Sequence, residues 1–203
     1  MARRKKEDSL ETRERILDAA EWCFCTYGVS QSTLALIAEK AECTRGAIYW
    51  HFPKEAEVLK LVLDRGRLSL QRRLASLTHA QPPLMPKLQV CLDDYLAEVS
   101  RNRHVRSTLK ILLLRCDYVG LRQAFVGRRY VEALEIYGPL VDLLARAHAA
   151  GEMAPELDPR NGAELLQCLL IGGLRKWLID SMDGDESSPR DILSLALGLL
   201  RVR

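Results

Sequence analysis

Apolar residues recur at helical spacing from Thr12 to the C-terminus, and this spacing constrains the fold more than any other feature of the chain. In the first clear segment they stand at i, i+4, i+7, i+8 and i+11, on one face of an α-helix. The members of that stripe are Ile16, Ala20, Cys23, Phe24 and Tyr27. No stretch alternates strictly between apolar and polar residues, as a half-buried strand would. The sequence therefore predicts an all-α protein of about nine helices.

Glycine, proline and capping residues divide the pattern into segments. Gly28 follows the first segment where a helix C-cap is expected, and Ser32 and Thr44 can each cap the helix that follows them. Pro53 then stops the third segment. Three short helices are therefore expected before it.

The later predicted helices are longer. They cover residues 54–78, 84–102, 104–117, 121–151, 160–182 and 189–202. Because no low-complexity linker interrupts the chain, we expect the helix at 54–78 to be a rigid rod. It would join a small N-terminal domain, residues 1–60, to a larger one, residues 61–203.

Composition excludes two classes of protein. The chain has 203 residues, of which 28% are charged, and no apolar run approaches the roughly 20 residues that a bilayer crossing needs. The basic residues at the start lead into acidic and polar ones, whereas a secretory signal continues into a hydrophobic stretch. We therefore expect a cytoplasmic protein rather than a membrane or secreted one.

The distribution of charge limits any argument for DNA binding. Residues 1–65 contain 11 Lys+Arg and 11 Asp+Glu, so the N-terminal part has no net charge to attract a polyanion. Local placement is more favourable, since two short segments carry basic residues without an acid. They are Arg3-Arg4-Lys5-Lys6, and Thr44 to Lys54 with Arg45, His51 and Lys54.

The second and third short helices fit a helix-turn-helix, whose second helix enters the major groove. On a helical wheel Ile48 and Phe52 face the core, which leaves Gly46 and Trp50 on the opposite side. Arg45, Ala47, Tyr49 and His51 lie on the flanks. We expect Arg45 to read guanine and Trp50 to contact thymine methyl groups. Outward aromatic side chains also occur at protein interfaces, and this alternative remains open.

The residues Thr33-Leu-Ala-Leu-Ile-Ala-Glu-Lys-Ala41 and Thr44-Arg-Gly-Ala-Ile-Tyr-Trp-His-Phe52 resemble the DNA-binding domain of the TetR family of transcriptional repressors. The second run looks most like the AcrR-type branch, which controls multidrug efflux. The resemblance implies a homodimer that blocks transcription from a palindromic operator until a small hydrophobic molecule binds the C-terminal domain. Residue types and resemblance together predict these DNA contacts: Arg3, Arg4, Lys5, Lys6, Ser32, Thr33, Thr44, Arg45, Gly46, Ala47, Tyr49, Trp50, His51 and Lys54.

The chain departs from the family pattern at two positions. Glu42 stands where the family has a glycine, which suggests either a strained residue with positive φ, at a cost of roughly 1–2 kcal/mol, or an altered turn. Glu55 stands where the family has a lysine at the start of the fourth helix. Because a carboxylate repels phosphate, we expect Lys54 to make the contact with a DNA phosphate instead.

The last two predicted helices carry wide apolar faces, and the resemblance implies that they form a four-helix bundle with a second copy. The predicted interface is Leu166, Leu169, Leu170, Gly173, Trp177, Leu195 and Leu199. An ordinary core within one chain is the alternative. Polar or aromatic residues on apolar faces are candidates for contacting the effector: Tyr95, Arg115, Cys116, Asp117, Tyr137, Gln167 and Trp177.

Other functions find little support in the sequence. It has none of the common hydrolase, metalloprotease or nucleotide-binding motifs, and its six cysteines are scattered without a C-x-x-C pair. We therefore expect no enzymatic activity, no cofactor and no metal. Two alternatives to a ligand-responsive repressor remain. One is a DNA-binding sensor of thiol oxidation at Cys43, and the other is a protein-binding adaptor that does not bind DNA.

Overall fold

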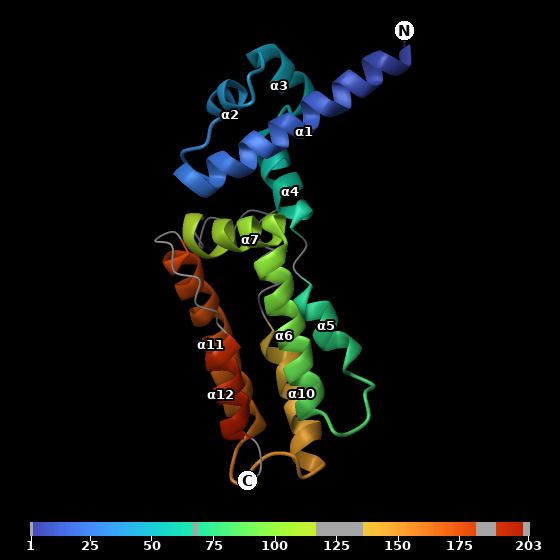
Figure 1. Ribbon diagram of the computed structural model, residues 1–203, viewed down its shortest axis with the longest axis vertical. Helices are drawn as coiled ribbons and strands as arrows, with labels where there is room; N and C mark the ends of the chain where they lie inside the picture. The colour runs from blue at the N-terminus through green and yellow to red at the C-terminus, as the bar shows by residue number, and fades with distance from the viewer. Residues whose placement is uncertain (1, 67–68, 117–135, 182–189, 201–203) are drawn as a thin grey trace. The chain divides into compact units, whose positions relative to one another are not determined.

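The computed structural model describes residues 2–66, 69–116, 136–181 and 190–200, which form ten α-helices, one π-helical segment and no strand (Figure 1). The elements are α1 (Ala2–Tyr27), α2 (Leu34–Lys40), α3 (Arg45–His51), α4 (Glu55–Arg65), α5 (Leu70–Ser76), α6 (Met85–Arg101), α7 (Arg103–Lys110), η1 (Ile111–Arg115), α10 (Tyr137–Ala149), α11 (Pro159–Asp180) and α12 (Arg190–Leu200). The predicted all-α fold is confirmed. None of the described helices is long and apolar enough to cross a membrane.

The helices divide between two compact units. The first contains α1 to α4 together with α7 and η1, and the second contains α5, α6 and α10 to α12. The chain thus enters the second unit after α4 and returns to the first for α7. This return could not be read from the helical spacing, because it depends on contacts between distant segments.

The core of the first unit follows the predicted stripe on α1. Ile16, Ala20, Cys23 and Phe24 are buried, and α1 packs against α2, α4 and α7. Tyr27, predicted on the same face, is exposed instead. It is the last residue of the helix, and its ring lies edge-on to that of Trp22 on the surface, at 5.4 Å between centroids.

The start of α2 differs from the sequence prediction by one residue. The Ser32 hydroxyl is buried and donates a hydrogen bond to the Gly28 carbonyl, at 2.7 Å. Thr33 caps α2 instead, since its Oγ1 accepts a hydrogen bond from Leu36 N at 3.3 Å. The prediction that Ser32 caps this helix was therefore wrong.

The predicted continuous helix at 54–78 is also wrong. The chain forms α4, which ends at Arg65, and α5, which begins at Leu70. Between them Gly66 is buried against α7, where a Cβ atom would overlap the His104 carbonyl and the Thr108 hydroxyl. Only glycine permits so close an approach.

A cluster of charged side chains joins three helices of the first unit. Arg65 on α4 donates hydrogen bonds to Glu14 and Asp18 on α1, at 2.6 and 2.8 Å. From α7, Arg103 reaches Asp18 at 3.3 Å and His104 Nδ1 lies 2.7 Å from Glu21. The contacts tie α1, α4 and α7 together.

The second unit is a bundle in which α6 and α11 are the long elements. Apolar side chains on one face of α6 are buried from Leu88 to Val99, and α11 packs against α10 and α12. The carboxylate of Glu152 accepts hydrogen bonds from Leu84 N at 2.7 Å and Met85 N at 2.8 Å, which satisfies the start of α6. The first part of the predicted helix at 121–151, up to residue 135, lies outside the described residues.

Candidate functional site

The turn between α2 and α3 is a Schellman motif with a glutamate in the glycine position. Glu42 has φ 52°, its N–H donates to the Glu39 carbonyl at 3.1 Å, and the Cys43 N–H donates to the Ala38 carbonyl at 3.0 Å. The backbone therefore adopts the turn that glycine usually forms at this position. Glu42 is held in the left-handed conformation, which is unfavourable for a residue with a side chain.

The orientation of α3 agrees with the helical wheel. The hydroxyl of Thr44 accepts a hydrogen bond from Ala47 N at 3.1 Å and so caps the helix, as predicted. Ile48 and Phe52 are fully buried. Trp50 is 73% exposed and Tyr49 is 55% exposed, so both rings point out of the unit.

The predicted DNA contacts of the first unit differ in exposure. Exposed are Thr33, Thr44, Arg45, Gly46, Tyr49, Trp50 and Lys54, whereas Ala47 and His51 are half-buried. Ser32 is buried, with its hydroxyl bound to Gly28. Arg3, Arg4, Lys5 and Lys6 belong to the first turns of α1, but their side chains lie outside the described part of the structure. Contact of these residues with DNA stays a prediction.

The ring of His51 is packed beside that of Trp50, with centroids 4.6 Å apart and planes at 80°. Burial, and then the charge of nearby Arg13, lower the pKa of His51 below its ordinary value. The shift favours the neutral imidazole, which can offer a hydrogen bond but no positive charge. Arg13, whose guanidinium lies 5.3 Å from the Phe52 ring centroid, was not among the residues that the sequence singled out.

Glu55 makes a contact that sequence reasoning missed. Its Oε1 accepts a hydrogen bond from the main-chain N–H of Leu34 at the start of α2, at 3.4 Å. Lys54 is the N-cap residue of α4, and its side chain is exposed. An acidic and a basic side chain thus stand side by side at the end of the unit that carries the starts of α2 and α4.

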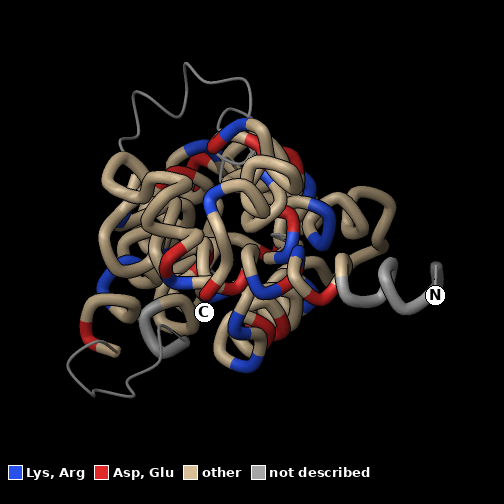
Figure 2. The backbone as a smooth tube through the Cα atoms, turned by 90° about the horizontal axis from the view of Figure 1, so that it is seen from above, with Lys and Arg blue, Asp and Glu red and all other residues tan. Residues whose placement is uncertain are grey.

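Charges of both signs are interspersed along the described chain rather than gathered by sign (Figure 2). This distribution agrees with the equal numbers of acidic and basic residues in 1–65. Any attraction for DNA therefore depends on local groups of basic residues rather than on the net charge of this part of the chain.

The environment of Cys43 opposes a role in thiol sensing. The side chain is half-buried, and burial raises the pKa of its thiol above the ordinary value. A reactive cysteine needs the opposite shift, because the thiolate is the nucleophile. Across the described residues, no group of three or more His, Cys, Asp or Glu side chains is placed to hold a metal ion.

The structure does not gather the predicted effector residues into one place. Tyr95 and Trp177 are buried in the second unit, where burial raises the pKa of the Tyr95 phenol, and the Gln167 side chain accepts a hydrogen bond from Ile136 N at 3.1 Å. Tyr137 is exposed at the start of α10. Arg115 and Cys116 belong to the first unit, at the end of η1, and Asp117 lies outside the described residues. Their role in effector binding stays a prediction.

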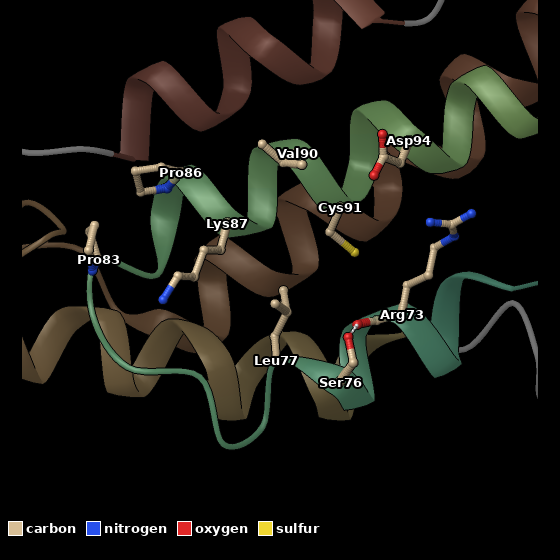
Figure 3. Close-up of a pocket in the computed structure, with 9 residues that line it drawn as sticks. All are labelled: Arg73, Ser76, Leu77, Pro83, Pro86, Lys87, Val90, Cys91 and Asp94. Carbon is tan, nitrogen blue, oxygen red and sulfur yellow. Dashed lines mark hydrogen bonds between the residues drawn. The ribbon is translucent and has the colours of Figure 1, made fainter.

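The second unit has an open groove of about 480 Å³ between α5, the start of α6 and the loop that joins them (Figure 3). None of the predicted effector residues is among the nine that line it. The groove lies beside the buried face of α6 and shares Cys91 with it, but its other α6 residues lie outside that face, so the periodicity that located the core could not reveal it.

The predicted dimer residues fall into two groups. Leu166, Leu170 and Trp177 are buried within the unit, and Leu169 and Gly173 are half-buried. Leu195 and Leu199 on α12 are 66% and 62% exposed. Leu165 and Ile179 on α11 are also exposed, although the sequence did not single them out. Apolar side chains thus remain uncovered on both helices.

Comparison with known proteins identifies relatives along the whole chain. The family model described as bacterial regulatory proteins, tetR family, matches residues 16–62, which include α2 and α3. The transcriptional regulator TtgR of Pseudomonas putida is 34% identical over 189 residues, which cover 90% of this chain and 89% of TtgR. The transcriptional repressor BepR of Brucella suis is 32% identical over 179 residues, covering 87% and 85% of the two chains.

Two solved structures are similar throughout. NalD, the secondary repressor of the MexAB-OprM multidrug efflux pump in Pseudomonas aeruginosa, has a TM-score of 0.73 and 29% identity, and the match covers 96% of this chain and 98% of NalD. A complex of SmeT with triclosan has a TM-score of 0.71 and 28% identity, covering 95% and 92%. SmeT represses the multidrug efflux pump SmeDEF of Stenotrophomonas maltophilia.

Proposed function

The chain belongs to the TetR family of DNA-binding transcriptional regulators, which are not enzymes, and we propose that it is a homodimeric repressor of an efflux or transport operon. A small hydrophobic molecule would release it from a palindromic operator.

The surface of α3 is the observation that supports operator binding most directly. Thr44 caps the helix through Ala47 N, the buried Ile48 fixes its rotation, and Trp50 is left 73% exposed. The sequence Arg45-Gly46 precedes the two exposed rings, so a fork of guanidinium donors and an unhindered backbone stand beside them. This combination suits entry into a major groove better than a solvated surface, where large apolar rings are rarely left together.

The exposed leucines of α12 support association with a second copy. Leu195 and Leu199 stand on one face of the helix, and Leu165 and Ile179 are exposed on α11, which packs against α12. In a symmetric dimer the same face of both subunits usually packs together, so each copy covers the apolar face of the other. In that dimer the two α3 helices must reach successive major grooves, about 34–36 Å apart.

The relatives support an efflux operon as the target and a small hydrophobic molecule as the effector. NalD and SmeT are named as repressors of multidrug efflux pumps, and SmeT has been solved with triclosan, a small apolar phenol. An effector of this kind releases the operator only if it binds the DNA-incompetent arrangement more tightly, because equal affinity for both arrangements shifts nothing.

Footprinting on the DNA that flanks the gene of this protein tests the proposal. We expect one palindromic protected site, whose protection is lost on addition of some members of a panel of hydrophobic drugs. An Arg45→Ala/Tyr49→Ala variant should leave no footprint, and binding should fall steeply with salt, as counterion release requires. Protection by the double variant equal to that of the parent, or a salt-independent interaction, would overturn the proposal in favour of a protein-binding adaptor.

A further inference from the structure

The groove between α5 and α6 has an apolar wall that the bundle leaves uncovered. Leu77 closes it on the side of α5, and Pro86, Val90 and Cys91 form the side of α6 (Figure 3). Val90 is 59% exposed. Burial raises the pKa of the Cys91 thiol to about 11, so the thiol stays neutral and forms part of the apolar wall. The volume of about 480 Å³ is in the range of small-molecule sites.

Charged side chains stand at the two ends of this wall, and they are not equivalent. Arg73 is already neutralised, since it donates hydrogen bonds to Ser69 Oγ at 3.0 Å and to the Glu98 carboxylate at 2.9 Å. The ammonium of Lys87 donates to the main-chain carbonyl of Gln81. Within the described residues no carboxylate pairs with Lys87 and no cation pairs with Asp94. One end therefore carries the Lys87 ammonium without a carboxylate partner, and the other, where Arg73 is paired with Glu98, carries the Asp94 carboxylate without a cationic partner.

The spacing of these two charges follows from the helix that carries both. Lys87 and Asp94 are seven residues apart on α6, which places them on the same face, about 10.5 Å apart along the axis. In Figure 3 they lie at opposite ends of the groove, with Val90 and Cys91 between them. A molecule lying along the groove would meet a cation, an apolar surface and then an anion.

We propose that this groove binds an elongated zwitterion: a carboxylate at the Lys87 end, an ammonium group roughly 10 Å away at the Asp94 end, and an apolar body on Val90 and Cys91. The site needs neither DNA nor a second copy of the chain, so it goes beyond the proposed repressor function. It is also distinct from the buried residues predicted to contact the effector.

Isothermal titration of the full-length protein with 4-(piperazin-1-yl)benzoic acid tests the assignment, because this compound carries the two charges at opposite ends of a rigid apolar body. Two analogues serve as matched controls: the methyl ester, which lacks the anion, and the N-acetyl derivative, which lacks the cation. We expect the zwitterion to bind about two- to fivefold more tightly than either analogue, the range of one partly exposed ion pair.

Variants assign each charge to its residue. Lys87→Met should weaken binding of the zwitterion about two- to fivefold and leave binding of the ester unchanged. Asp94→Asn should weaken binding of the zwitterion by the same factor and leave binding of the N-acetyl derivative unchanged. Val90→Trp should fill the groove and abolish binding of all three compounds, with an unfolding temperature equal to that of the parent because the side chain is exposed.

Equal affinity for the zwitterion and its two analogues, undetectable binding of all three, or binding that survives Val90→Trp would overturn the assignment. Operator binding of the same preparations, measured without any compound, separates this result from the proposed function. A variant that binds the operator normally but no longer binds the zwitterion supports the proposed site in the groove. A parent protein that binds the zwitterion but no DNA also supports that site, and it contradicts the proposed repressor function.

Discussion

The carboxylate of Glu55, in the first turn of α4, accepts a hydrogen bond from the main-chain N–H of Leu34 at the start of α2, at 3.4 Å. The first N–H groups of a helix have no partner within it, and in DNA-binding proteins they commonly bind phosphate. Here the N–H of Leu34 donates to the Glu55 side chain of the protein itself. Glu55 therefore places a negative charge at the start of α2, whereas the preceding residue, Lys54, is an exposed positive one.

Glu55→Gln should tighten operator binding about two- to tenfold and steepen its salt dependence, because one repulsive charge is removed while the amide oxygen can still accept from Leu34. Lys54→Ala should have the opposite effect, with a salt slope lower by about one. Fluorescence anisotropy at several salt concentrations measures both. Glu57, also exposed in the first turn of α4, provides the control Glu57→Gln, which removes one negative charge at a neighbouring position. Equal effects of the substitutions at 55 and 57 on operator binding would show that the position of Glu55 is not important.

Trp50→Ala and Ile48→Ala should separate recognition from folding. Loss of the exposed indole should weaken operator binding at least about tenfold, the value of one good base contact, and change the free energy of unfolding by less than about 0.5 kcal/mol. Loss of the fully buried Ile48 side chain should cost about 2–5 kcal/mol of stability. Urea unfolding measured beside the binding titrations tests the contrast, and a Trp50→Ala protein that unfolds as early as Ile48→Ala would contradict it.

Glu42→Gly should stabilise the protein by about 1 kcal/mol, because glycine adopts φ 52° without the penalty that a side chain incurs. The same substitution at Glu39, inside α2, should cost about 1 kcal/mol by weakening the helix. The two variants lose the same side chain within three residues of each other. Their denaturant midpoints should therefore move in opposite directions, and a common direction would show that the turn is not strained.

Leu195→Glu/Leu199→Glu should convert the proposed dimer to monomers, because the two substitutions place carboxylates on exposed apolar positions of α12. Sedimentation velocity gives the assembly state. Val90→Glu, a substitution at an equally exposed apolar residue on α6, is expected to leave the dimer intact. A double variant that still sediments as the parent would place the dimer interface elsewhere.

Operator binding should resist thiol oxidation. Burial raises the pKa of the Cys43 thiol, so at pH 7 to 8 less thiolate is present than on an unperturbed cysteine, and reactivity should appear only at more alkaline pH. Iodoacetamide at pH 8 should modify the exposed Cys168 before Cys43, as followed by peptide mass spectrometry. Release of operator DNA by hydrogen peroxide in the parent but not in Cys43→Ser would instead support the thiol sensor.

The features predicted correctly from the sequence are those that depend on neighbours along the chain. Helical spacing located most helices, and the rotation of α3 followed from the positions of Ile48 and Phe52. The Thr44 cap is local too, and the φ of 52° at Glu42 decides between the two alternatives left open for that turn, a strained residue and an altered turn, in favour of the first.

The features that were missed depend on contacts between distant segments. Gly66 interrupts the expected rod because α7, about 40 residues later, packs on it. The contact of Glu55 with Leu34 spans 21 residues, and the groove requires α5 and α6 to lie side by side. Helical periodicity shows which face of a segment is buried, but not which other segment covers it.

The return of α7 to the first unit affects how operator specificity could be exchanged between relatives. Val105 and Leu109 of α7 are buried there, and Arg103 and His104 reach the acids of α1. A chimera that grafts only residues 2–66 onto a foreign partner would remove the contacts of α7 with α1 and α4 and leave apolar surface in water. The transplantable module is therefore two separate pieces of polypeptide, and a single crossover point between parental genes would cut through it.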